Sequence, residues 1–154
     1  MKQKLNNTPR GIRNNNPLNI RRYVHNDWLG KIHDDVAKDM EFEEFRHAKY
    51  GFRASFILIH RYIKQGFSSV RDIINRWSPT TDGNNVEVYL SVLRSYGLNS
   101  NDVIRCCDWK SMSALVEGMF AVENGVCIHD LPDRLYWYDA MSTGFDLYLE
   151  RFVN

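Results

Sequence analysis

The residue of this sequence best placed to do chemistry is Glu123. It takes the next inward helical position after the apolar residues Met112, Val116 and Met119, and an Asn-Gly pair that can end a helix follows it. We therefore expect Glu123 to face the interior from the last turn of a helix. Desolvation and the negative end of the helix dipole both favour a protonated acid there. Such a group is what cleavage of a glycosidic bond requires of its general acid.

Two other interpretations of this segment stay open. Glu123 can pair with an arginine, or point to water at a frayed helix end. Asn-Gly is also the strongest turn signal for a hairpin, so AVENGVCI (121–128) can instead be two strands. The apolar stripe upstream favours the helix; its members are Met112, Leu115, Val116, Met119 and Phe120.

A second candidate is the segment RNNNPLNIR (13–21), which holds four asparagines within six residues. Their amides suit sugar hydroxyls, but asparagine is also frequent wherever a turn needs its backbone capped, and both interpretations remain. Among the aromatic residues, Trp28, Tyr89 and Tyr96 are candidate platforms for sugars or bases. Trp77 lies on an apolar stripe, which favours packing in the core.

No cofactor or metal is expected from the motifs. The chain lacks a phosphate-binding glycine loop, a serine nucleophile elbow and a zinc signature. His33 with Asp34 and Asp35 has no spaced partner that would complete a cation site. The three cysteines, Cys106, Cys107 and Cys127, are predicted to be reduced thiols that are buried or half-buried.

Length and charge bound the remaining possibilities. The chain has 154 residues, 44% of them hydrophobic, which is typical of one globular domain. No apolar run is long enough to cross a membrane and no secretory signal is visible, so we expect a soluble protein made in the cytosol. Residues 1–31 carry a net charge of +6 and residues 102–154 a net charge of −5. The basic arm suits an anionic polymer or packs against the acidic third of its own fold.

The periodicity predicts five helices and a mainly α domain. A loose terminus at 1–10 precedes a domain over 11–154, whose first part (11–51) is irregular and rich in asparagine. MEFEEF (40–45) is a candidate short strand or edge segment. The helices are expected from Gly51 to about Gly66, from Ser68 or Ser69 to Pro79, around 89–97, from about Lys110 to 124, and around 145–152 at the C-terminus.

Several of these pieces, in the same order, resemble a family of small phage and prophage proteins labelled structural protein P5, which is related to lysozyme-like peptidoglycan-cleaving domains. The matching pieces are RGIRNNNPLNIR (10–21), WLGK (28–31), FEEF with YGFRA (42–54), VRDIINRWSP (70–79), the stretch 84–89 and AVENG (121–125). The resemblance implies a lysozyme-like helical fold that acts on peptidoglycan glycan strands. The Asn-Pro-x-Asn-Ile piece is also similar to a loop that follows the catalytic helix in flagellar glucosaminidases. That helix comes late in this chain, so the order is circularly permuted if Glu123 is the equivalent residue.

The resemblance also implies roles for individual residues. Its Glu-Asn-Gly motif falls on Glu123. Apart from the resemblance, Glu43 or Glu44 in the MEFEEF segment is our candidate for a second carboxylate. Where the family commonly has a glutamate, this chain has Gly83. The expected substrate-binding residues are Asn15, Asn16, Asn19, Arg21, Trp28, Asn84 and Tyr89.

The preferred function is therefore cleavage of peptidoglycan strands by a muramidase or lytic transglycosylase of phage or prophage origin. We expect a monomer that acts at the cell wall or travels in a virion, with glycan strands and virion components as partners. The alternative is a virion structural or wall-binding protein that keeps the fold without turnover. Nucleic-acid binding by the basic arm is disfavoured and would weaken steeply with salt.

Overall fold

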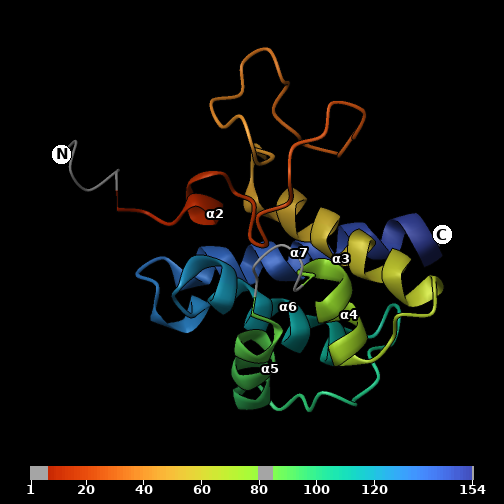
Figure 1. The fold of residues 1–154 in the computed structure, drawn as a ribbon. Coiled ribbons are helices and arrows are strands. Elements are labelled where there is room, and N and C mark those ends of the chain that lie inside the picture. The colour runs from red at the N-terminus through yellow and green to blue at the C-terminus, as the bar shows by residue number, and fades with distance from the viewer. Residues whose placement is uncertain (1–6, 80–84, 154) are drawn as a thin grey trace.

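The computed structural model of this chain describes residues 7–79 and 85–153, and it is mainly helical (Figure 1). Within those ranges it has no named strand; three isolated bridges join Arg21 to Phe42, Lys31 to Phe45 and Ser69 to Val103. The elements in chain order are α2 (Arg10–Arg13), α3 (Ala48–Lys64), α4 (Val70–Trp77), α5 (Val86–Ser95), α6 (Trp109–Asn124), the 3-10 helix η2 (Ile128–Asp130) and α7 (Arg134–Val153). The prediction of a mainly α fold is confirmed.

Capping side chains fix where three of the predicted helices begin. Ser69, Asn85 and Asp108 each accept a hydrogen bond from a backbone N–H in the first turn of α4, α5 and α6 respectively. At the other end of α6, Gly125 has a left-handed φ of 68° and closes the helix directly after Glu123 and Asn124. The hairpin interpretation of this segment is therefore wrong.

Other boundaries differ from the sequence prediction. α3 begins at Ala48, where the His47 side chain accepts from the backbone N–H of Lys49. α7 begins at Arg134, well before the predicted stripe at 145–152, because its first half buries Trp137, Ala140 and Met141. The short α2 and η2 were not predicted, since neither is long enough to show a helical period.

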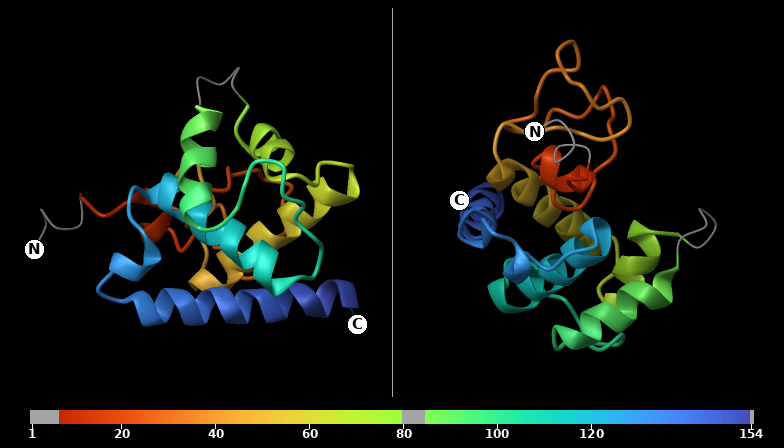
Figure 2. Two further views of the ribbon diagram at one scale, coloured as in Figure 1. Left: turned by 90° about the horizontal axis from the view of Figure 1, so that it is seen from below. Right: turned by 90° about the vertical axis from the view of Figure 1, so that its left-hand side faces the viewer.

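The core forms where α3 lies along α7. Aromatic contacts follow both helices in the same direction, from Phe52 with Trp137, through Phe56 with Phe145, to His60 with Tyr148. The two helices therefore run in the same general direction, and they cross obliquely (Figure 1 and Figure 2). α6 packs across this pair, and α4 and α5 lie on its other side (Figure 2).

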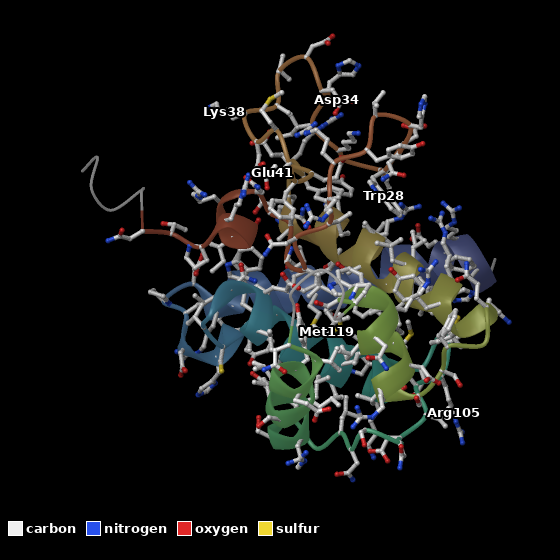
Figure 3. The ribbon with its side chains drawn as sticks, in the orientation of Figure 1. Trp28, Asp34, Lys38, Glu41, Arg105 and Met119 are labelled. Atoms are coloured by element: carbon white, nitrogen blue, oxygen red, sulfur yellow. The ribbon has the colours of Figure 1, made fainter. Side chains whose placement is uncertain are left out.

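Residues 21–45 form an irregular excursion that stands out from the helices (Figure 1). MEFEEF is not a strand: Phe42 and Phe45 make isolated bridges at the base of the excursion. The fully buried Glu43 faces Lys31, with Nζ 3.2 Å from Oε2. Asp34 and Lys38 lie far out on the excursion, while Trp28 lies close to α3 (Figure 3).

Among the described residues, no helix combines the length and the apolar character that crossing a membrane would require. Cys106, Cys107 and Cys127 are free and half-buried, as predicted. In the same ranges no three His, Cys, Asp or Glu side chains gather as they would around a metal ion.

Candidate active site

The site is a pocket of about 380 Å³ between the base of the excursion and helices α3 to α6. The N-terminal segment, four helices and the loop after α4 all contribute to its wall. The lining residues are Asn19, Ile20, Arg21, Phe42, Leu58, Tyr62, Trp77, Ser78, Tyr89 and Glu123. Glu123 is the one carboxylate in that set of described residues.

Both oxygens of the Glu123 carboxylate accept hydrogen bonds. Oε1 accepts from the Tyr89 hydroxyl at 2.5 Å and from the Trp77 indole Nε1 at 3.3 Å. Oε2 accepts from Asn19 Nδ2 at 3.0 Å. Since each carboxylate oxygen offers about two acceptor positions, Oε2 keeps one without a partner among the described residues. That position is where a proton or a substrate oxygen can meet the carboxylate.

The sequence near the ends of α4 and α5 explains why Trp77 and Tyr89 lie where they can donate to Glu123. Tyr89 lies on the buried face of α5, one turn after the Asn85 cap. Trp77 is the last residue of α4, which ends there because Pro79 follows. Burial and the nearby Glu123 carboxylate raise the pKa of the Tyr89 phenol, so the hydroxyl stays protonated and donates.

The asparagines of the N-terminal segment have two kinds of role: some stabilise the local backbone, and one contacts Glu123 in the pocket. Asn16 is fully buried and bonds only the backbone: its Nδ2 donates to Ile20 O and Glu43 O, and its Oδ1 accepts from Ile20 N. Asn15 bonds Phe45 O and the Tyr136 hydroxyl. Asn19 has a left-handed φ of 53° and turns its side chain to Glu123.

The same loop is fastened to the end of α6 by a second asparagine. Asn124 Nδ2 donates to Pro17 O at 2.9 Å, next to the contact between Asn19 and Glu123. Gly11 in α2 fits beneath this junction. A Cβ there would lie 2.5 Å from Asn124 Oδ1 and 2.7 Å from Asn16 O, so the position has no room for a larger residue.

Arg21 and Phe42 form the edge of the pocket on the excursion side. They are joined by an isolated bridge, and the exposed Arg21 guanidinium lies 5.5 Å from the centre of the Phe42 ring. On the helical side, Tyr62 and Trp77 are in edge contact. The pocket therefore combines one carboxylate, one cation and four aromatic rings, those of Phe42, Tyr62, Trp77 and Tyr89.

The structure brings together four of the predicted site residues, Asn19, Arg21, Tyr89 and Glu123. Glu43 and Glu44 do not line the pocket: Glu43 bonds the backbone N–H of Tyr23, and Glu44 bonds that of Lys38. Trp28 also lies elsewhere, buried beneath Arg61. Asn84 lies outside the described residues.

Trp77 is the site residue that sequence reasoning assigned to the core. The prediction that Trp77 lies on an apolar stripe was correct, since Ile73 and Ile74 of the same helix are fully buried. Its indole N–H, however, is directed at Glu123. The position of Trp77 at the very end of α4 was the available signal, because a terminal aromatic residue is free to turn out of the core.

Comparison with known proteins assigns the family. No family model matches the chain. The sequence is 32% identical over 146 residues to Protein P5 of Pseudoalteromonas phage PM2, an alignment that covers 92% of this chain and 83% of that protein. Glu123, Asn19 and their surroundings thus belong to a chain that is related to a phage protein over nearly all of its length. The chain belongs to the phage protein P5 family.

Proposed function

We propose that this protein cleaves the glycan strands of peptidoglycan, with Glu123 as general acid, on a lysozyme-like fold whose order is circularly permuted. The observation that carries the proposal is a single carboxylate, held by three donors, in a pocket walled by aromatic rings. Aromatic faces suit the apolar faces of sugar rings, and a positioned carboxylic acid can protonate a glycosidic oxygen. The sequence resemblance to the P5 family, which we expect to be related to lysozyme-like domains, supports the same chemistry.

The hydrogen bonds around Glu123 assign different tasks to its two oxygens. Oε1 is held by Tyr89 and Trp77, which fix the plane of the carboxyl group. Oε2 has the open position, so it carries the proton that passes to the leaving glycosidic oxygen as the bond from the anomeric carbon breaks. Asn19 orients Oε2 through its amide.

The lone carboxylate favours a lytic transglycosylase over a two-carboxylate hydrolase. A retaining hydrolase needs a second carboxylate at about 5–5.5 Å and an inverting one at about 6.5–9.5 Å. Glu43 is fully buried beside Lys31, and Glu44 lies 3.7 Å from Arg22, so neither is offered to the pocket. In a transglycosylase a hydroxyl of the substrate attacks the anomeric carbon, forms an internal ether and returns its proton to Glu123. Asp82 lies outside the described residues and is tested below as a second carboxylate.

The decisive experiment is to incubate the purified protein with peptidoglycan and identify released fragments by mass spectrometry. We expect fragments with anhydro ends from the native protein and none from Glu123→Gln. Glu117→Gln is the matched control, because Glu117 lies on the same helix and also accepts from a tyrosine, Tyr138, but outside the pocket. Reducing ends in place of anhydro ends, lost in Asp82→Asn, would indicate hydrolysis with Asp82 as second carboxylate. No release from walls of several chemotypes would overturn the proposal.

A specific observation favours the non-catalytic alternative as second candidate. Glu123 joins the N-terminal segment, α4 and α5 to the end of α6, which is a complete structural role without turnover. A virion or wall-binding protein of this kind would pellet with peptidoglycan and release nothing. Glu123→Gln would then lower stability and leave pelleting unchanged in the folded fraction.

A further inference from the structure

A second pocket, of about 310 Å³, lies where the excursion meets α3 and α7. We call it the arginine pocket; its lining residues are His25, Asn26, Asp27, Trp28, Arg61 and Arg151. It shares no lining residue with the candidate active site. Arg61 comes from α3, Arg151 from the last turn of α7, and the other four from the excursion.

The arginine pocket holds two guanidinium groups that form no ion pair among the described residues. Neither Arg61 nor Arg151 forms an ion pair with any residue in the described ranges; the Arg61 guanidinium instead lies 5.4 Å from the centre of the Trp28 ring. Arg53 lies about two turns before Arg61 on α3 and does not line the pocket, but it is close enough to interact with the Arg151 charge. Burial and the repulsion of Arg151 lower the pKa of Arg53.

Negative groups also lie near the arginines. Asp27 lines the pocket, and Glu150 acts on Arg53. Helices α3 and α7 run in the same general direction and end on the same side of the molecule, and each helix C-terminus carries roughly half a negative charge (Figure 2). The two guanidinium groups at the pocket nevertheless have no oxygen partner among the described residues.

Trp28, which lines the same pocket, carries a donor without a partner in the described part of the chain. Trp28 is 7% exposed, and its indole Nε1 is buried with no hydrogen-bond partner among the described residues. A buried N–H without a partner is costly, so an acceptor that enters beside Trp28 would remove a penalty as well as add a contact.

We propose that the arginine pocket binds a phosphate group. Its donors come from three separate elements, the excursion, α3 and α7, and so approach from different directions. A tetrahedral oxyanion with several oxygens can serve donors arranged in this way. A planar carboxylate is instead satisfied by one guanidinium in a two-point contact.

The test is a titration of the full chain with sodium phosphate and with glycerol 3-phosphate at constant ionic strength, followed by NMR. We expect saturable shifts of the Trp28 indole N–H, which the Trp28→Phe spectrum identifies, and of the Arg61 and Arg151 side chains. Arg61→Gln and Arg151→Gln should each raise the dissociation constant about tenfold, and Arg61→Lys less, because lysine keeps the charge but loses the forked donor. Arg94→Gln, an exposed arginine in the last turn of α5, is the control and should bind like the native chain.

Dispersed spectra of every variant verify that each one is folded. Equal binding of phosphate by the native chain and both glutamine variants would overturn the proposal. Sodium acetate is titrated in the same way, and acetate binding as tightly as phosphate would also overturn it. Shifts from inorganic phosphate without shifts from glycerol 3-phosphate would exclude an ester as the ligand. None of these readouts depends on glycan cleavage, so the proposed function stands or fails separately.

Discussion

Asn19 donates a hydrogen bond from its side-chain amide to the carboxylate of Glu123, which lies 104 residues later in the chain. The same amide lies 3.3 Å from the Glu123 backbone carbonyl, so one side chain contacts both the end of α6 and the acid that the helix carries. Asn19 can do this because its left-handed backbone turns the side chain towards α6. The irregular N-terminal segment is therefore part of the candidate site.

Replacing Asn19 by glycine separates the two roles of this residue. Glycine accepts the left-handed backbone without strain, so Asn19→Gly removes the amide alone, whereas Asn19→Ala adds backbone strain. We expect Asn19→Gly to fold and to bind chitooligosaccharide or muropeptide more weakly, as measured by calorimetry. Asn19→Ala should unfold at a urea concentration lower than Asn19→Gly does. Unchanged affinity for the glycan ligand in the glycine variant would show that Asn19 has a role only in the turn and none in binding.

Tyr89→Phe removes one donor from Glu123 and keeps the ring. We expect a loss of about 1 kcal/mol in the free energy of unfolding, because a partly buried carboxylate loses a short hydrogen bond. Fragment release from peptidoglycan should fall as well, since the carboxyl plane is held by Trp77 alone on the Oε1 side. Tyr138→Phe removes the equivalent bond to Glu117 and should leave release unchanged. Equal release from both variants would show that the bond from Tyr89 does not position the acid.

Gly11→Ala tests the packing beneath the junction of the N-terminal loop and α6. The new methyl group would meet Asn124 Oδ1 and the Asn16 carbonyl at less than contact distance, and the latter belongs to the backbone. We expect a destabilisation of about 1–3 kcal/mol in urea unfolding, as for other overpacked sites. Gly66→Ala is the comparison: a Cβ there meets nothing within 4 Å, so its cost is backbone strain at φ +99° alone. A Gly11 variant as stable as the native chain would mean that the loop shifts freely on α6.

Asp39 should make the stability of the N-terminal segment depend on pH. Hydrogen bonds from Arg10, at 2.6 and 2.7 Å, hold the pKa of the Asp39 carboxyl well below its ordinary value. A depressed folded-state pKa contributes stability that is fully present above the unfolded value of about 3.9 and is lost as the pH falls towards the folded value. Asp39→Asn should therefore be less stable than the native chain at pH 6, with the gap narrowing below about pH 4.

The measurement for Asp39 is urea unfolding of both proteins at a series of pH values. Asp35→Asn, a change at an exposed carboxylate of the same excursion, is the control and should follow the native curve. A gap between Asp39→Asn and the native chain that stays constant down to pH 3 would show that the pair with Arg10 does not set this pH dependence.

The sequence by itself determined that the five longer helices exist, and it determined the inward position of Glu123. The signals are the apolar spacing, the caps Ser69 and Asp108, and Gly125. Each of these signals acts within a few residues of its own position, so it can be recognised in the sequence alone. For the same reason α6 ends where the Asn-Gly pair predicted, and its last inward position is an acid.

Only the tertiary structure decided which groups surround that acid. Asn19 reaches Glu123 because the N-terminal loop docks on the end of α6, and Trp77 does so because α4 ends beside it. Glu43 and Glu44 are withdrawn from the pocket by bonds and ion pairs within the excursion, which no local pattern encodes. The partner of a polar atom depends on how distant segments pack, whereas helical periodicity reports only which side of its own element a residue faces.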